Sequence, residues 1–293
     1  MKQTRHLLIA LALGTMLTSC GASVSTATVT GPAAYVDPYI GSGGHGHVFV
    51  GASVPFGAIQ AGPQNIHKGW DWCSGYHHSD SIVIGFAHTH LSGTGCTDMG
   101  DVQIMPYTGE LRSKRGRQED IGGSCSSYYS HDNESVSPGY YSLKMDNGVR
   151  IEMTASTRTA LHRITYPEAE GRRLLINLEE GNGDGAYDTY LRQTDAHTVE
   201  GYRFSKGWGP HKVFFALTTD KPIRSLALFD ADTPSEGSEI RCKGAKGVLT
   251  FDDEKHVMVK VAISSVSSAN ALENLRTEIP GWEKSGLQIL HAE

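Results

Sequence analysis

Residues 149–155 read Val-Arg-Ile-Glu-Met-Thr-Ala, and residues 257–263 read Val-Met-Val-Lys-Val-Ala-Ile. In both stretches an apolar residue recurs at every second position. Side chains alternate between the two faces of a strand, so this pattern predicts strands with one face in a core. Asn147 and Gly148 directly precede the first stretch and are typical of a tight hairpin turn. The two stretches therefore predict antiparallel strands.

Short segments of the same kind lie on both sides of these two stretches. They are residues 82–86, 102–105, 140–144, 161–166, 173–177, 191–194, 201–205, 213–218, 226–229 and 247–251. No helical pattern of ordinary length separates them, which excludes helices alternating with the strands of a parallel sheet. Many short strands joined by turn residues favour two packed sheets. The sequence thus predicts a mainly β fold, a two-sheet antiparallel β-sandwich over residues 35–266.

One helix is predicted close to the C-terminal end, within residues 267–293. Ser267 is a candidate N-cap residue, and Pro280 with Gly281 forms a stop signal. Between them, apolar residues recur at helical spacing at Ala271, Leu272, Leu275 and Ile279. We expect a C-terminal helix that links the sandwich to whatever follows it.

The N-terminal residues read as a targeting segment. Lys2 and Arg5 precede an apolar run, residues 7–17, that is too short for a stable membrane-spanning helix. Cys20 follows the run, and the arrangement resembles a bacterial lipoprotein signal, in which that cysteine carries the lipid. We therefore predict a signal peptide over residues 1–20, a flexible tether over residues 21–34 and a lipid-anchored protein of the bacterial cell envelope, periplasmic or on the outer-membrane surface. The alternative is an ordinary secretory signal.

The charge balance limits the partners. The formal net charge of the 293 residues is −6 at pH 7, and a phosphate backbone needs a basic surface, so nucleic acid is excluded as a partner. Contact with a membrane is expected only through the lipid. Cys73 and Cys96 lie near the two ends of a stretch, residues 69–96, that is rich in tryptophan and histidine. The cell envelope is oxidising, which permits a disulfide between these two cysteines. No Cys-x-x-Cys spacing of a metal site occurs.

Chemically costly side chains gather between residues 69 and 96. The first part of this stretch contains Trp70, Asp71, Trp72, His77 and His78. An indole face can stack on the apolar face of a pyranose, while carboxylate and imidazole groups bind its hydroxyls. These five residues are therefore predicted to contact a sugar. The alternative is that the two tryptophans fill a core and the histidines lie in turns.

Four motifs that occur in one order resemble the N-terminal domain of glycoside hydrolase family 92. They are Val-Asp-Pro-Tyr-Ile-Gly-Ser-Gly-Gly-His-Gly-His (residues 36–47), Val-Pro-Phe-Gly (54–57), Gly-Trp-Asp-Trp-Cys-Ser-Gly-Tyr (69–76) and His-Thr-His-Leu-Ser-Gly-Thr-Gly (88–95). Residues 261–267 and 278–282 resemble the end of that domain. The likeness covers about residues 35–282.

This resemblance implies a calcium-dependent, exo-acting α-mannosidase in which a β-sandwich packs against an (α/α)6 helical barrel with the active site between them. It also implies inversion, with a general acid on one side of the bond and a carboxylate that activates water on the other. Ca²⁺, a cation that prefers oxygen ligands, would help distort the sugar. A tryptophan of the 70–72 loop would line the subsite beside the cleaved bond, and the resemblance does not say which one.

The resemblance also implies where the chemistry lies. The acid, the base and the calcium ligands of the family belong to the helical barrel, and about twelve helices of ~11–12 residues do not fit after Trp282. We therefore expect a truncated chain that contains no catalytic residue and no metal ligand, binds no calcium alone and is inactive by itself. Its partners would be a mannose-containing glycan and the C-terminal helical domain.

Three other interpretations remain open. A lone sandwich on a lipid anchor could be a glycan-binding lipoprotein without catalysis. A remnant without any ligand would expose an apolar docking face and aggregate. Finally, His45 with His47 and His88 with His90 are spaced two apart, which on strands places each pair on one face and could form a zinc or copper site.

Overall fold

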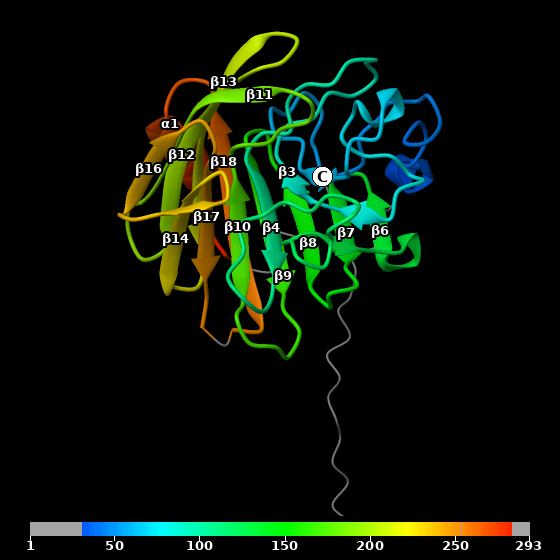
Figure 1. The fold of residues 1–293 in the computed structure, drawn as a ribbon. Helices are drawn as coiled ribbons and strands as arrows, with labels where there is room; N and C mark the ends of the chain where they lie inside the picture. The colour runs from blue at the N-terminus through cyan, green and yellow to red at the C-terminus, as the bar shows by residue number, and fades with distance from the viewer. Residues whose placement is uncertain (1–30, 253, 283–293) are drawn as a thin grey trace, which may run out of the picture.

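The computed structural model describes residues 31–252 and 254–282. Eighteen strands and one α-helix follow one another in chain order (Figure 1). The strands are β1 (Gly62–Gln64), β2 (Ile82–Val83), β3 (Gly85–Ala87), β4 (Gln103–Tyr107), β5 (Ser127–Tyr128), β6 (Glu134–Ser137), β7 (Tyr140–Lys144), β8 (Arg150–Ala155), β9 (Thr159–Thr165), β10 (Arg173–Asn177), β11 (Gly185–Gln193), β12 (Thr198–Lys206), β13 (Pro210–Thr219), β14 (Ser225–Asp230), β15 (Thr233–Ser235), β16 (Glu239–Cys242), β17 (Ala245–Thr250) and β18 (His256–Ser264).

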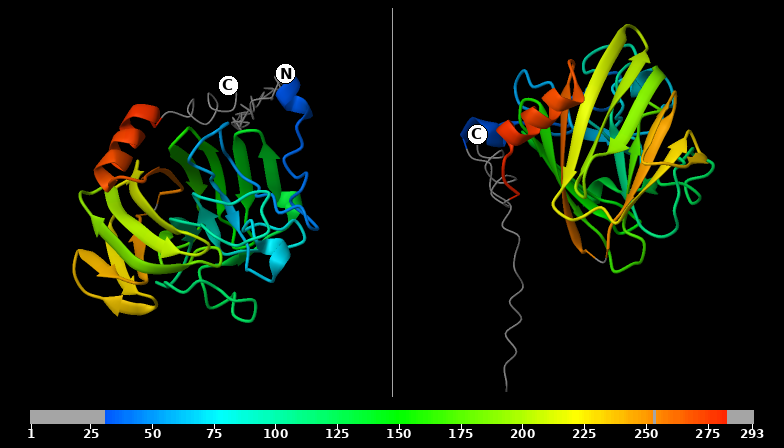
Figure 2. Two further views of the ribbon diagram at one scale, coloured as in Figure 1. Left: turned by 90° about the horizontal axis from the view of Figure 1, so that it is seen from above. Right: turned by 90° about the vertical axis from the view of Figure 1, so that its left-hand side faces the viewer.

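The strands form two large antiparallel sheets. One sheet has the order β1-β3-β4-β10-β17-β14-β15, and the other has the order β16-β11-β12-β13-β18-β9-β8-β7-β6, with β2 and β5 as a separate pair. Figure 2 shows the sheets as two layers from two further directions. The predicted β-sandwich is confirmed.

The core lies between the layers. Phe86, Ile104 and Leu174 of the first sheet and Leu143 and Val259 of the second belong to one buried apolar cluster, each 0% exposed. Apolar side chains are buried because their removal from water stabilises the fold by roughly 25 cal/mol per Å² of apolar surface. The alternating stretches 149–155 and 257–263 supply one face of β8 and β18 to this core.

The hairpin predicted at Asn147-Gly148 joins β7 to β8. Gly148 has φ +85°, the left-handed region that glycine adopts without strain. The Met145 amide donates to the Val149 carbonyl at 2.9 Å, and the Val149 amide donates to Asn147 Oδ1 at 3.0 Å. The turn sets the register that pairs Leu143 with Ile151.

The predicted helix is α1 (Ser268–Glu278). It packs on the outer face of the nine-stranded sheet against β13 and β18, and Ala271 and Leu275 are its buried residues. Below it, Lys260 Nζ donates to the Ile279 carbonyl at 2.6 Å and lies 4.1 Å from the centroid of the Trp282 ring. The chain therefore leaves the helix in a direction fixed by contacts with β18.

Replacing Ser267 with alanine is expected to lower the free energy of unfolding by about 1 kcal/mol. Ser267 Oγ accepts a hydrogen bond from the Asn270 amide at 3.1 Å, which satisfies one of the free N–H groups at the start of α1. Urea unfolding at pH 7 measures the loss. Ser267→Asp keeps an acceptor and should retain most of the stability, and an equal loss in both variants would contradict the capping role.

Several predicted segments lie outside the described residues. These are the signal peptide (1–20) with its lipidation site Cys20, most of the tether (21–30) and the last residues of the linker (283–293). The last residues of the tether, 31–34, lie in the short 3-10 helix η1 (Gly31–Tyr35). Among the described residues, no helix combines the length and the apolar character needed to cross a bilayer.

Candidate functional site

An open cavity of about 590 Å³ lies where the N-terminal loops meet the tip of the β12–β13 hairpin. In Figure 1 the loops of residues 36–101, in blue and cyan, gather at one end of the sheets, and the hairpin rises from the same end. The cavity is lined by His67, Trp70, Cys73, Gly95, Cys96, Thr97, Gly183, Lys206, Gly207 and Trp208. Two of these are large exposed aromatic residues, Trp70 at 58% and Trp208 at 78%.

Trp70 is exposed but firmly held. It opens the short 3-10 helix η2 (Trp70–Trp72), and its indole Nε1 donates to the Gly95 carbonyl at 2.8 Å. The edge of the His47 ring packs against it, with ring centroids 4.2 Å apart. A Cβ at Gly95 would lie 3.0 Å from Nε1, so the close approach of the loop needs glycine there. The apolar face of Trp70 is thus fixed towards the cavity.

Asp71 binds two histidines next to Trp70. His45 Nδ1 lies 2.6 Å from Asp71 Oδ1, and His47 Nε2 lies 3.3 Å from the same oxygen. The hydrogen bond from His45, followed by that from His47, holds the pKa of Asp71 below its usual value, so the carboxylate is ionised at neutral pH. Asp71 therefore connects the loop of Trp70 to His45 and His47, and it does not line the cavity.

The other three residues predicted to contact sugar lie away from the cavity lining. Trp72 stacks on His77 with ring centroids 4.4 Å apart, and its Nε1 donates to Asp80 Oδ2 at 2.9 Å. His77 also contacts the Gly44 carbonyl at 3.2 Å. His78 stacks on His131 at 4.2 Å. Among the five, the structure therefore brings only Trp70 to the cavity surface.

Cys73 and Cys96 both line the cavity, and both are free thiols in the structure. Cys73 Sγ donates to the Thr94 carbonyl at 2.8 Å, and Cys96 Sγ lies 3.9 Å from Thr94 Oγ1. Burial raises the pKa of the Cys73 thiol, which opposes formation of the reactive thiolate. The predicted disulfide between them is not formed here.

The paired histidines do not converge on one another. His45 and His47 bind Asp71, whereas His88 is fully buried between the sheets and contacts His162 with a distance of 2.9 Å between the two Nε2 atoms. The four imidazoles therefore do not form the zinc or copper site that their spacing left open.

A buried ionic network lies beneath the hairpin tip. Arg203 is 0% exposed, and its Nη1 lies 2.6 Å from Asp101 Oδ1 and 2.7 Å from Asp184 Oδ2. His211 Nε2 lies 3.2 Å from the Asp101 carboxylate and its Nδ1 lies 3.8 Å from Asp98 Oδ1. The hydrogen bond with Asp101 raises the pKa of His211. Burial pushes the pKa of Asp101 upwards, but His211 and Arg203 outweigh it, so the pKa is lowered.

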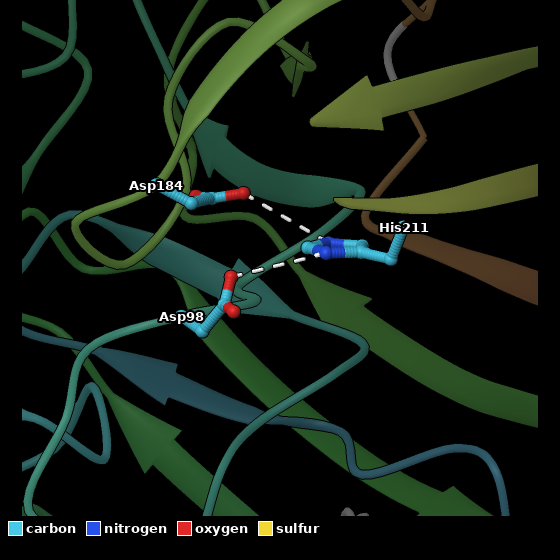
Figure 3. A group of neighbouring side chains, drawn as sticks. All are labelled: Asp98, Asp184 and His211. Atoms are coloured by element: carbon cyan, nitrogen blue, oxygen red, sulfur yellow. Dashed lines mark ion pairs between the residues drawn. The ribbon is translucent and has the colours of Figure 1, made fainter. Parts of the chain in front are cut away.

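Within the described residues, Asp98, Asp184 and His211 are the one group of three potential metal ligands that lie within 4.8 Å of one another (Figure 3). The group does not suit Ca²⁺. Asp184 already accepts hydrogen bonds from Nη1 and Nη2 of Arg203, at 2.7 Å and 3.0 Å. A metal ion at this place would be repelled by the positive charge of that guanidinium. One of the three ligands is an imidazole, whereas Ca²⁺ prefers oxygen. The arrangement is that of an ion-pair network.

Trp208, Lys206 and His67 line the cavity but were not predicted from the sequence as residues of a site. Trp208 stands between Gly207 and Gly209 and between two strands, a combination typical of a hairpin tip that displays one side chain. This pattern could have predicted an exposed Trp208 at a hairpin tip. The position of His67 has no such signal in the sequence.

The family model described as "Glycosyl hydrolase family 92 N-terminal domain" matches residues 35–264. An uncharacterized secreted glycosidase of Arthroderma benhamiae is 32% identical over 287 residues, which cover 85% of this chain and 35% of the relative.

Solved structures agree with the family match. A family GH92 α-mannosidase from Bacteroides thetaiotaomicron, in complex with mannoimidazole, is 34% identical with a TM-score of 0.83, and the match covers 88% of this chain and 36% of that one. A family GH92 inverting mannosidase from the same species is 23% identical with a TM-score of 0.74 over 92% of this chain and 35% of that chain, and shows the fold alone. The chain thus spans about a third of the length of the relatives it matches. It belongs to glycoside hydrolase family 92, and it corresponds to the N-terminal domain of that family.

Proposed function

We propose that this chain is the sandwich half of the sugar-binding site of an exo-acting α-mannosidase that removes terminal α-linked mannose from glycans. The observation that carries the proposal is Trp70, an indole that is 58% exposed in a cavity and yet fixed by a hydrogen bond to Gly95. A rigid, exposed indole face is suited to the apolar face of a pyranose. An aromatic residue that merely filled the core would be buried.

The relatives support the substrate class. The α-mannosidase whose structure contains mannoimidazole is 34% identical to this chain over a match that covers 88% of this chain and 36% of that one. In an inverting hydrolysis the two carboxyl groups are held about 6.5–9.5 Å apart, which leaves space for the attacking water. We assign neither group to this chain and expect it to be inactive alone. Calcium, if the whole enzyme uses it, would be bound by other parts of a longer protein.

The second candidate is a glycan-binding lipoprotein without catalysis. It is favoured by the same indole, because Trp70 is exposed, held by Gly95 and on the cavity surface of this chain without a catalytic domain beside it. Reading the coding DNA downstream of Glu293 separates the two candidates. A continuing frame that encodes a helical domain supports the mannosidase, and a stop codon supports the binding protein.

We also propose that the protein is anchored in the bacterial cell envelope through a lipid on Cys20. The support is the sequence of residues 1–20, together with the secreted relative. Metabolic labelling with a fatty acid should label the wild-type chain and fail to label Cys20→Ala.

Replacing Trp70 with alanine is expected to weaken the binding of methyl α-mannoside about 30-fold, because truncating a central aromatic contact typically costs about 2 kcal/mol or more. Titration followed by protein NMR measures the affinity. Tyr128→Ala removes a 47%-exposed aromatic side chain on β5 and should leave the affinity unchanged.

Three results would contradict the proposal. They are the absence of mannoside binding by the wild-type chain, equal affinity of wild-type protein and Trp70→Ala, and binding of a galactoside as strong as that of the mannoside. Release of mannose by the purified chain in the presence of calcium would contradict its expected inactivity.

A further inference from the structure

We infer that Trp208 is a second sugar-binding residue of the same cavity, which takes the neighbouring sugar ring of an α-linked disaccharide, and that Asp98 holds it in place. This inference rests on the proposed function. It adds a residue outside the 69–96 stretch and assigns it to the ring beyond the one that Trp70 binds.

Trp208 occupies the tip of the hairpin between β12 and β13. Its side chain is 78% exposed and lines the cavity together with Trp70. A single exposed apolar residue is common, but two exposed indoles that line one cavity are the kind of grouped apolar surface that marks ligand-binding sites. Lys206 and His67, which line the same cavity, are also exposed and add groups that can hydrogen-bond sugar hydroxyls.

The loop that carries Trp208 is rigidly attached. Both the Trp208 amide and the Gly209 amide donate to Asp98 Oδ2, at 3.0 Å and 3.3 Å. Asp98 is only 6% exposed, and its other oxygen accepts from the Met99 amide at 2.9 Å. Hydrogen bonds from backbone N–H groups to an ionised carboxylate are among the stronger ones in proteins. A loop tip that only connected two strands would not need such an anchor.

Gly207 shows how closely the tip fits onto this anchor. A Cβ at Gly207 would lie 2.5 Å from Asp98 Oδ1 and 2.8 Å from Asp184 Cβ, so any larger residue would push the tip away. At Gly209, on the other side of Trp208, a Cβ would meet nothing within 4 Å. The two glycines therefore form a matched pair: only the first is required for the position of Trp208.

The size of the cavity fits a ligand larger than one sugar ring. Its volume of about 590 Å³ lies in the middle of the range of roughly 300–1,000 Å³ typical of sites for drug-sized ligands. Two exposed indoles that line one such cavity provide a stacking surface for each ring of a disaccharide.

The test compares two probes, methyl α-mannoside with one ring and α-linked mannobiose with two, titrated by NMR into the 293-residue chain. Trp208→Ala should weaken mannobiose binding roughly 10-fold and change methyl α-mannoside binding less than about twofold. Trp70→Ala should weaken both. Gly207→Ala should reproduce the Trp208→Ala pattern, and Gly209→Ala should bind both probes as the wild-type chain does. Retained binding of methyl α-mannoside shows that Trp208→Ala, Gly207→Ala and Gly209→Ala are folded, and a wild-type unfolding transition in urea shows it for Trp70→Ala.

The outcomes separate this inference from the proposed function. If the wild-type chain binds neither probe, the proposed function fails and the inference falls with it. If the wild-type chain binds both and Trp208→Ala keeps its affinity for mannobiose, the inference is wrong and the proposed function stands. If Trp208→Ala weakens both probes equally and still unfolds in urea as the wild-type chain does, Trp208 contacts the ring bound by Trp70, which also overturns the inference. Equal behaviour of Gly207→Ala and Gly209→Ala would refute the role of the Asp98 anchor.

Discussion

Replacing Arg203 with methionine is expected to lower the free energy of unfolding by about 3–5 kcal/mol. The guanidinium is fully buried and pairs with Asp101 and Asp184, whose side chains are 1% and 0% exposed. Methionine fills much of the space but leaves two buried carboxylates without the guanidinium, and His211 is the cation that remains beside them. Removal of one member of a buried ion pair is costly because the remaining charge stays desolvated.

The matched control is Arg241→Met. Arg241 forms a comparable bidentate pair with Asp188, at 3.0 Å and 2.8 Å, but its side chain is 68% exposed. Exposed pairs contribute about 0–1 kcal/mol because water and salt screen them. Urea unfolding of both variants at pH 7 should therefore give losses that differ severalfold.

The pH dependence identifies the cause of the loss in Arg203→Met. In the wild-type protein the pKa of Asp101 is lowered, so its contribution to stability is present above its unfolded pKa of about 3.8 and is lost as pH falls through the folded value. Without Arg203, burial should raise the pKa of Asp101, and protonation of this carboxylate then removes the uncompensated buried charge in the variant. The stability difference between the two proteins should narrow from pH 7 towards pH 4. A loss below about 1 kcal/mol, or one that is constant with pH, would refute this explanation.

The sequence predicted those parts of the fold in which local pattern and tertiary environment agree. The stretches 149–155 and 257–263 alternate because one face of each strand enters the core, and α1 begins at its predicted cap. Strand β11 is a contrasting case: it runs from Gly185 to Gln193, but only 191–194 was predicted. Thr189 and Leu191 are its buried residues, so the alternation is too weak to show its full length.

Arg203 shows the limit of pattern reading more sharply. On β12, Gly201, Arg203 and Ser205 are the buried positions at one end of the strand, where alternation leads one to expect apolar residues. An arginine fits there only because Asp101 and Asp184 reach it from distant parts of the chain. No local signal reports such a partner, since the residues that neutralise the charge are set by the packing of the two sheets.

The same limit applies to the candidate site. Trp70 was predicted because tryptophan, aspartate and histidine occur together in one short stretch. Its neighbours in that stretch, Trp72 and His77, instead stack on each other away from the cavity lining. Trp208 joins the cavity through its hydrogen bond to Asp98, 110 residues earlier. Composition identified the loop, but only the packing of the sheets decides which of its side chains face the cavity.

A second large effect is expected from acid, because two fully buried histidines contact each other between the sheets. His88 Nδ1 lies 2.6 Å from the Val102 carbonyl and must donate to it, so His88 Nε2 accepts a hydrogen bond from His162 Nε2–H at 2.9 Å. His162 Nδ1 is buried and has no hydrogen-bond partner. Both rings are therefore neutral. A second proton on either ring would create a buried positive charge with no carboxylate of the described residues beside it.

Burial lowers the pKa of His88 from 6.5 to about 4, and burial together with His88 lowers the pKa of His162 well below 6.5. Between pH 6.5 and pH 4 the unfolded chain therefore binds protons that the folded chain does not. The free energy of unfolding must therefore fall as pH falls through this window. The lowering of the His88 pKa from 6.5 to about 4 alone corresponds to a loss of about 3 kcal/mol. Urea unfolding at several pH values between 7 and 4 measures the slope.

His162→Gln tests the assignment, because glutamine can still donate to His88 Nε2 but does not titrate. This variant should lose stability less steeply between pH 6.5 and pH 4 than the wild-type protein, since one buried histidine with a lowered pKa is gone while His88 and His90 remain. His67→Gln, which changes an exposed histidine of the cavity, should keep the wild-type slope. Carboxylates such as Asp101 titrate in all three proteins, so their contribution cancels in the comparison. If His162→Gln and the wild-type protein show the same slope, acid sensitivity arises elsewhere, and the buried pair must be able to take up a proton without opening the sandwich.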